Sequence, residues 1–140
     1  MKVKELLEKG LIKEQAVDVE EIKGSLLLAQ RFLERAKGNI EINFYDVAFL
    51  LSYNSMFHAA RALLFKTGYK ERTHFGLIEA IRETYKSDKE IQDFLNVLDN
   101  YRLTRHAIQY SGELSDEINA VQSAKDAEAL ITLVKKKLEL

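Results

Sequence analysis

The fold is decided by one stretch of the sequence, FYDVAFLLSYNSMFHAARALLFK, which covers residues 44–66. Apolar side chains occupy more of its helical circumference than in the other predicted helices, which is typical of a segment covered by several neighbours. The stretch stops before Gly68, a residue suited to the left-handed position that follows a helix end. We therefore expect residues 44–66 to form the central helix.

The flanking segments also favour helices. Apolar residues recur at intervals of four and three in the second helix, at Ile22, Leu26, Ala29, Leu33 and Ala36. Apolar patterns and helix-end signals predict five further helices: over residues 2–9 before Gly10; from Asp18, with Glu21 in a capping box, to Gly38 or Asn39; from Thr73 or the residues just beyond it to about Tyr85; from a Ser87 and Glu90 capping box to about Tyr110; and from about Asp116, capped by Ser115, to about Lys137. The predicted fold is all-α, an antiparallel up-and-down bundle of about five main helices with a short N-terminal helix.

The composition agrees with a single domain over residues 1–140. It has 46% hydrophobic residues, 31% charged residues and no proline, which suits helices. The 21 basic and 22 acidic residues give a formal charge of −1, so any contact with nucleic acid must come from a local patch. The absence of cysteine excludes disulfides, thiolate zinc sites and cysteine nucleophiles.

The sequence also bears on location. The first residues, MKVKELLEK, lack the apolar core of a signal peptide. The longest apolar runs fall far short of the roughly 20 residues that a membrane span needs. We expect a soluble cytoplasmic protein with no membrane contact.

A polar ribbon near the end of the fifth predicted helix is the best candidate for a site. Arg102, Arg105, His106 and Gln109 follow one another at helical spacings, and Tyr110 flanks them. The three-and-four rhythm of the apolar residues places Arg105 on the core-directed side of the helix. Arginines bind phosphate, histidine titrates near neutrality and tyrosine stacks on bases, so the residue types suit RNA.

A plainer interpretation of this ribbon stays open. Arginines on an amphipathic helix often pair with neighbouring carboxylates, and Asp99 lies three residues before Arg102. His106 would then be an ordinary surface residue.

A second polar face crosses the central helix. Asn54, His58 and Arg61 lie on one side of it, at offsets of four and three. This face could reach towards the Arg105 helix and contribute to RNA or nucleotide binding, form a dimer surface, or fix the helix register through a buried hydrogen-bond network.

The remaining histidine, His74, is expected to be a local cap or a surface residue at a helix start. The three histidines 58, 74 and 106 are scattered, with no pair at metal-binding spacing. No phosphate loop or nucleophile elbow is present either. We expect neither a metal site nor a cofactor.

Three segments carry a resemblance to a known family. The stretch FLLSYNSMFHAARALL at residues 49–64, the Gly68-Tyr pair and the THFGL run at residues 73–77 resemble the central part of small prokaryotic HEPN proteins (higher eukaryotes and prokaryotes nucleotide-binding). The alanines of the second helix and the tyrosine that ends the fifth helix extend the resemblance over most of the chain.

The resemblance implies expectations about activity. Many HEPN proteins are metal-independent endoribonucleases whose motif is an arginine followed by a histidine after four to six residues, with a cleft formed across a homodimer. Here only three residues separate Arg102 from His106, and Gln109 follows Arg105 where a histidine could stand. Glutamine hydrogen-bonds but does not titrate, so a motif position at Gln109 implies a binding-only cleft.

Three hypotheses for function result. The first is a HEPN-like dimer that binds RNA or nucleotide and acts with a small nucleotidyltransferase in a toxin–antitoxin-type pair. The resemblance implies that such a partner could modify Tyr110. The second is a metal-independent endoribonuclease that uses Arg102 and His106 as catalytic residues across a homodimer cleft. The third is a non-catalytic structural or interaction module.

Overall fold

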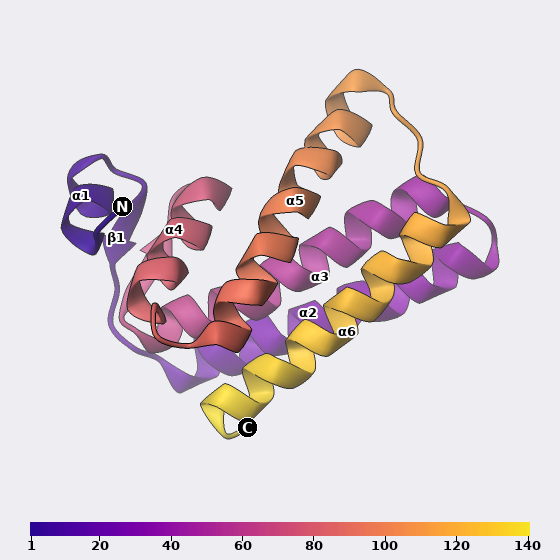
Figure 1. Ribbon diagram of the computed structural model, residues 1–140. Coiled ribbons are helices and arrows are strands. Elements are labelled where there is room, and N and C mark those ends of the chain that lie inside the picture. Colours follow the sequence, from indigo (N-terminus) through magenta and orange to yellow (C-terminus); the bar gives the residue numbers. More distant parts are fainter.

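The computed structural model describes residues 1–140 and contains six helices and two short strands (Figure 1). In chain order these are α1 (Val3–Glu8), β1 (Ile12–Glu14), α2 (Val19–Glu41), α3 (Tyr45–Lys66), β2 (Tyr69–Glu71), α4 (His74–Thr84), α5 (Lys89–Ser111) and α6 (Glu117–Leu138). The predicted all-α fold is confirmed. No helix combines the length and hydropathy that a membrane span needs.

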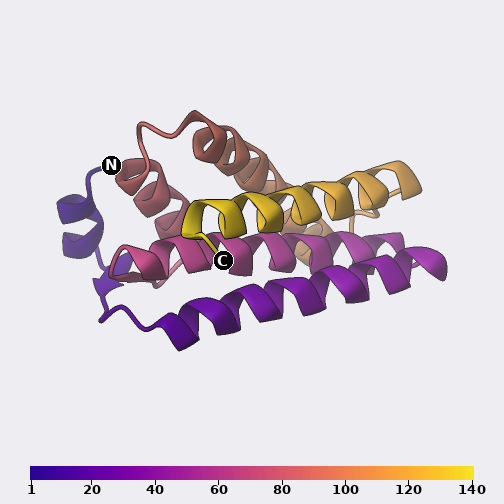
Figure 2. The same cartoon turned by 90° about the horizontal axis from the view of Figure 1, so that it is seen from below.

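Helix α3 lies at the centre, as predicted. It packs against α2, α6, α5 and α4, and Figure 2 shows α2, α3 and α6 side by side along much of their length. Small residues let α2 and α3 approach closely: Ser25 Oγ donates to the carbonyl of His58 at 2.8 Å, and Ser55 Oγ donates to the carbonyl of Ala29 at 2.7 Å. These bonds satisfy the hydroxyl groups between the two helices.

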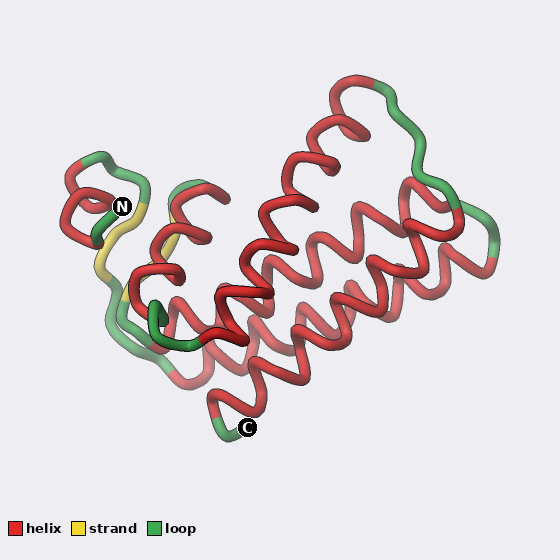
Figure 3. Tube along the Cα trace, viewed as in Figure 1, coloured by secondary structure: helices red, strands yellow, loops and turns green.

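Helix α5 differs from the other long helices. Its first half buries Ile91, Leu95 and Leu98, whereas beyond Leu98 only Ile108 is buried. Figure 1 and Figure 3 show α5 leaning away from α6 towards its C-terminal end, where a loop returns the chain to the bundle. The second half of α5 therefore projects from the bundle and leaves most of its side chains at least partly accessible.

A two-stranded sheet is present that the sequence pattern did not predict. Strands β1 and β2 pair antiparallel, with Ile12 opposite Glu71 and Glu14 opposite Tyr69. Gly68, at φ +89°, turns the chain from α3 into β2. Three-residue strands are too short to show an alternating pattern, so only the approach of two distant segments creates them.

The start of α4 packs closely against the residue that precedes strand β1. A Cβ added at Gly76 would lie 2.3 Å from the carbonyl oxygen of Leu11, so only glycine fits here. Helix α4 begins close to Thr73, as predicted, and Thr73 caps it, because its Oγ1 accepts from the amide of Gly76 at 2.8 Å. The first turn of α4 is thereby held at a defined position.

Several predicted helix boundaries were wrong by a few residues. Helix α2 continues through Gly38 and Asn39 to Glu41, since an exposed glycine inside a helix costs only about 1 kcal/mol. Asp88 rather than Ser87 caps α5, and Asp116 rather than Ser115 caps α6. In both cases an aspartate stands next to the serine and also accepts a backbone hydrogen bond well.

The predicted capping box at the start of α2 is only half formed. Asp18 accepts from the amide of Glu20 at 2.9 Å. Glu21 instead accepts a hydrogen bond from Gln15 Nε2 at 2.7 Å, so it does not reach back to the cap residue.

Candidate functional site

A hollow of about 530 Å³ lies between the start of α4 and the projecting half of α5. Its lining consists of Thr73, His74, Phe75, Arg102, Leu103, Arg105 and His106. We call it the α4–α5 hollow. Helix α5 supplies both arginines and His106 from about one turn, and the capped first turn of α4 supplies the opposite wall.

The two arginines of this hollow are held differently. Arg102 Nε donates to Asp99 Oδ1 at 2.9 Å, the pairing that the plainer interpretation expected. Arg105 Nη1 donates to Gln109 Oε1 at 3.0 Å, a partner without charge. Arg105 also lies over the ring of Tyr53 at 5.2 Å, and its buried Nε has no hydrogen-bond partner. The charge of Arg105 is therefore not neutralised by a carboxylate.

His74 is a residue of this hollow that the sequence analysis missed. It is half-buried rather than a cap or surface residue. Its Nδ1 lies 2.7 Å from the hydroxyl of Tyr53, and its ring stacks on Phe57 at 4.1 Å. Burial, and then the charges of Arg105 and Arg102, lower its pKa to about 4. The residue is thus neutral at neutral pH.

His106 and Tyr110 lie towards the open side of α5. The His106 ring is exposed and 4.8 Å from the ring of Tyr110, whose side chain is 65% exposed. Neither Gln109 nor Tyr110 lines the hollow. Arg102 and His106 therefore share the hollow, while Gln109 lies beside it as the partner of Arg105.

Two residues of the α3 polar face, His58 and Arg61, make their contacts away from the α5 arginines. His58 stacks on Phe32 of α2 at 5.5 Å, and Arg61 Nε lies 2.6 Å from Glu71 Oε1. Both line a separate hollow of about 270 Å³, the α2–α3 hollow, together with Glu21 and Lys70. Asn54 is half-buried and lines neither hollow. The sequence pattern could not reveal this, because Glu71 belongs to the unpredicted strand. The binding roles expected for Asn54, His58 and Arg61 stay predictions.

The α2–α3 hollow also contains a neutral histidine. Burial, and then the charge of Arg61, lower the pKa of His58 to about 4. Burial raises the pKa of Glu71, although Arg61 acts in the opposite direction. This arrangement holds a buried carboxylate against an arginine.

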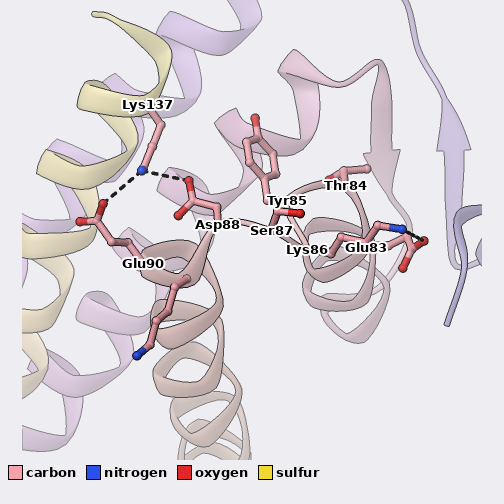
Figure 4. A pocket seen from close by; sticks show the side chains of 9 residues that line it. Glu83, Thr84, Tyr85, Lys86, Ser87, Asp88, Glu90 and Lys137 are labelled. Atoms are coloured by element: carbon pink, nitrogen blue, oxygen red, sulfur yellow. Dashed lines mark hydrogen bonds and ion pairs between the residues drawn. The ribbon is translucent and has the colours of Figure 1, made fainter.

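A further hollow of about 680 Å³ lies at the turn between α4 and α5 (Figure 4). Lys137 Nζ lies 2.9 Å from Asp88 Oδ2 and 3.1 Å from Glu90 Oε1. Lys86 pairs in turn with Glu83 at 3.7 Å. The charged side chains that line this hollow thus neutralise one another, which suits a structural contact that joins α5 to the end of α6.

The α4–α5 hollow differs from the others in that no acidic side chain lines it. No aspartate or glutamate lines it, whereas each of the four other main hollows includes at least one glutamate. No group of three His, Asp or Glu side chains comes together as a metal ion would need. The residues present suit an anion.

Comparison with known proteins places this arrangement in a family. The HEPN domain model matches residues 22–137. A UPF0332 protein from Archaeoglobus fulgidus is 27% identical over 121 residues, which cover 84% of this chain and 94% of that relative. The crystal structure of TT1696 from Thermus thermophilus shares the fold at a TM-score of 0.66 and 19% identity, covering 83% of this chain and 97% of that chain. The resemblance drawn from residues 49–77 is thereby confirmed, and the chain belongs to the HEPN domain family.

Proposed function

We propose that the α4–α5 hollow binds phosphate groups of RNA or of a nucleotide. The observation that carries this proposal is a hollow with two guanidinium groups and no lining carboxylate. Guanidinium groups bind phosphate oxygens through charge-assisted, often bidentate hydrogen bonds. Arg105 contributes a full positive charge, because its partner Gln109 is neutral.

An aromatic surface lies next to these cations. Phe75 lines the hollow and is 37% exposed, so part of this aromatic residue is accessible to a base. Stacking of a base on an aromatic ring contributes about 1–3 kcal/mol in single-stranded nucleic-acid complexes. The hollow therefore offers the two contacts that a nucleotide requires, for its phosphate and for its base.

Fluorescence polarisation with a labelled single-stranded RNA tests this proposal, with ATP as a competing mononucleotide. We expect Arg102→Ala and Arg105→Ala each to weaken binding by about tenfold and to reduce the salt slope by about one. Arg31→Ala, on the exposed face of α2 and without an ion pair, is the matched control and should stay within about twofold of wild type. No binding by any of these proteins would favour the non-catalytic structural module.

We further propose that a small nucleotidyltransferase is the partner, in a toxin–antitoxin-type pair. The supporting feature is Tyr110, which is 65% exposed and which a second protein could therefore reach and modify. Mass spectrometry of the protein from its native host, with and without the adjacent genes, tests this. A nucleotide adduct on Tyr110 that requires a neighbouring nucleotidyltransferase gene is the expected result. An unmodified Tyr110 with no such gene nearby would contradict it.

A homodimer is also proposed, with the projecting part of α5 at its interface. Exposed apolar side chains gather along α5, the following loop and the start of α6, at Leu103, Tyr110, Leu114 and Ile118. Light scattering should report twice the chain mass, and Leu114→Ser with Ile118→Ser should reduce it to the monomer. A monomeric wild type at high concentration would contradict this.

Ribonuclease activity is a second candidate function. It is favoured by the shared position of Arg102 and His106 in one hollow, where an imidazole could move a proton while a guanidinium stabilises charge on phosphorus. Incubation of RNA with the protein in a chelator provides the test. Cleavage that both Arg102→Ala and His106→Ala abolish would establish this activity over binding alone.

A further inference from the structure

We propose that His74 is a third phosphate-contacting group of the α4–α5 hollow, a neutral donor whose tautomer is set by Tyr53. The inference rests on the proposed function of this hollow and assigns a role to one more of its residues. It starts from two observations: the hydroxyl of Tyr53 lies 2.7 Å from Nδ1 of His74, and His74 lines the hollow. The remaining ring nitrogen, Nε2, is the one left for a ligand.

The direction of the hydrogen bond follows from the state of Tyr53. The side chain is fully buried in the bundle core, and burial raises its pKa to about 12, so the phenol keeps its proton. His74 Nδ1 is the hydrogen-bond partner of this hydroxyl in the structure. A buried hydroxyl with one partner donates to it when that partner can accept. The hydroxyl of Tyr53 therefore donates, and Nδ1 of His74 accepts.

This direction determines where the proton of His74 resides. A neutral imidazole carries one proton, and a ring whose Nδ1 accepts must carry it on Nε2. The neutral form is favoured because the ring is half-buried and faces Arg105 and Arg102 from α5 and His58 from α3. Nε2–H is thus a hydrogen-bond donor next to two guanidinium groups, and all three match the oxygens of a phosphate.

The packing around His74 holds this donor in place before a ligand arrives. Its ring stacks on Phe57 with an interplanar angle of 22° and on Tyr53 with an angle of 15°. Thr73 and Gly76 fix the backbone of the same turn. A donor that is already ordered loses little side-chain entropy on binding. Tyr53 acts only through His74 and is a positioning residue.

This assignment separates the two histidines of the hollow. With Nδ1 occupied and Nε2 protonated, His74 has no free lone pair with which to remove a proton from a 2′-hydroxyl. His106, with its exposed ring, is the histidine of the hollow that remains available for proton transfer.

Nitrogen-15 NMR of the wild-type protein at pH 7 tests the tautomer without any substitution. We expect His74 to show a protonated Nε2 and an unprotonated Nδ1, and its Nε2 resonance to shift when inorganic phosphate is added. Tyr53→Phe should yield a mixture of tautomers. A wild-type His74 protonated at Nδ1, or unaffected by phosphate that shifts the Arg105 side-chain signals, would overturn the proposal.

Binding of the labelled RNA supplies the second test. A glutamine places its amide nitrogen about where Nε2 stands, so His74→Gln should retain affinity within about twofold, whereas His74→Phe should lose about fivefold. Equal affinity of His74→Phe and wild type, with loss in Arg105→Ala, would overturn the role of His74 and leave the proposed function standing. No loss in Arg105→Ala would remove the proposed function itself. Circular dichroism melting confirms that each variant is folded.

Discussion

The α2–α3 hollow and the α4–α5 hollow contain similar residues in different electrostatic settings. Each combines an arginine with a half-buried histidine whose pKa is lowered to about 4. In the first, Arg61 pairs with Glu71, which is only 7% exposed. In the second, Arg105 pairs with the neutral Gln109. The comparison teaches that the α4–α5 hollow leaves one arginine without a charged partner, whereas the arginine of the α2–α3 hollow is paired with a carboxylate.

The largest expected effect lies in the α2–α3 hollow. Arg61→Met leaves the buried Glu71 without its counter-charge, and we expect a loss of about 3 kcal/mol in the free energy of unfolding. The double variant Arg61→Met with Glu71→Gln removes both charges and should recover most of the stability. Urea denaturation measures both, and equal stability of the two variants would show that Arg61 stabilises by packing alone.

Acidification should lower the free energy of unfolding through the histidines of both hollows. Each histidine has a folded-state pKa of about 4 against an ordinary value of 6.5, so the unfolded chain binds more protons between these values. The corresponding stability is full above pH 6.5 and is lost as the pH falls towards 4. After allowance for partial exposure of the rings, we expect about 1 kcal/mol per histidine.

Urea midpoints between pH 7 and pH 4 check this expectation. His58→Phe and His74→Phe keep an aromatic ring in each stack and should each flatten the profile. A pH dependence that is unchanged in the double variant would assign the acid sensitivity to other groups.

One substitution should give the arginine of the α4–α5 hollow the same charge pairing as the arginine of the α2–α3 hollow. Gln109→Glu gives Arg105 a carboxylate partner, as Arg61 already has, and should weaken RNA binding by about fivefold, or ~1 kcal/mol. Gln109→Met removes the same hydrogen bond without adding charge and should stay within about twofold of wild type. Fluorescence polarisation compares the two. If both bind like wild type, the charge of the arginine partner does not govern binding.

The smallest effect is expected at Asp99. Its carboxylate neutralises Arg102 at 2.9 Å, so Asp99→Asn should raise the affinity for RNA by about twofold. The pair is partly exposed, and its loss should change the free energy of unfolding by no more than about 0.5 kcal/mol. Asp93→Asn, also on α5 and without an ion pair, is the control. Weaker binding by Asp99→Asn would mean that the carboxylate orients Arg102 for the ligand.

Helical spacing predicts those interactions that join residues close together in the sequence. The pairing of Arg102 with Asp99 and the inward position of Arg105 follow from helical offsets of three and four, and the structure shows both. The start of α4 near Thr73 was also predicted, and the structure shows that the side-chain oxygen of Thr73 caps it. By contrast, the pairing of Arg61 with Glu71 joins a helix to a strand that no pattern indicated.

His74 shows most clearly why a site can escape a sequence. Beside a threonine at a helix start, it has the pattern of an ordinary cap region. Its contacts with Tyr53 and Phe57 span more than fifteen residues and depend on how α4 packs against α3. Periodicity within one helix carries no information on contacts between residues so far apart in the sequence.

By itself, the sequence determined the all-α class, the central position of residues 44–66, the helix-start signal at Thr73 and the cluster of cations on α5. Those features depend on helical periodicity and capping, which act within a few residues. Only the tertiary structure decided that His58 and Arg61 lie apart from Arg105, that His74 joins it, and that no carboxylate lines their hollow. These features depend on contacts and charges between segments that are distant in the sequence, and they arise only when the helices pack together.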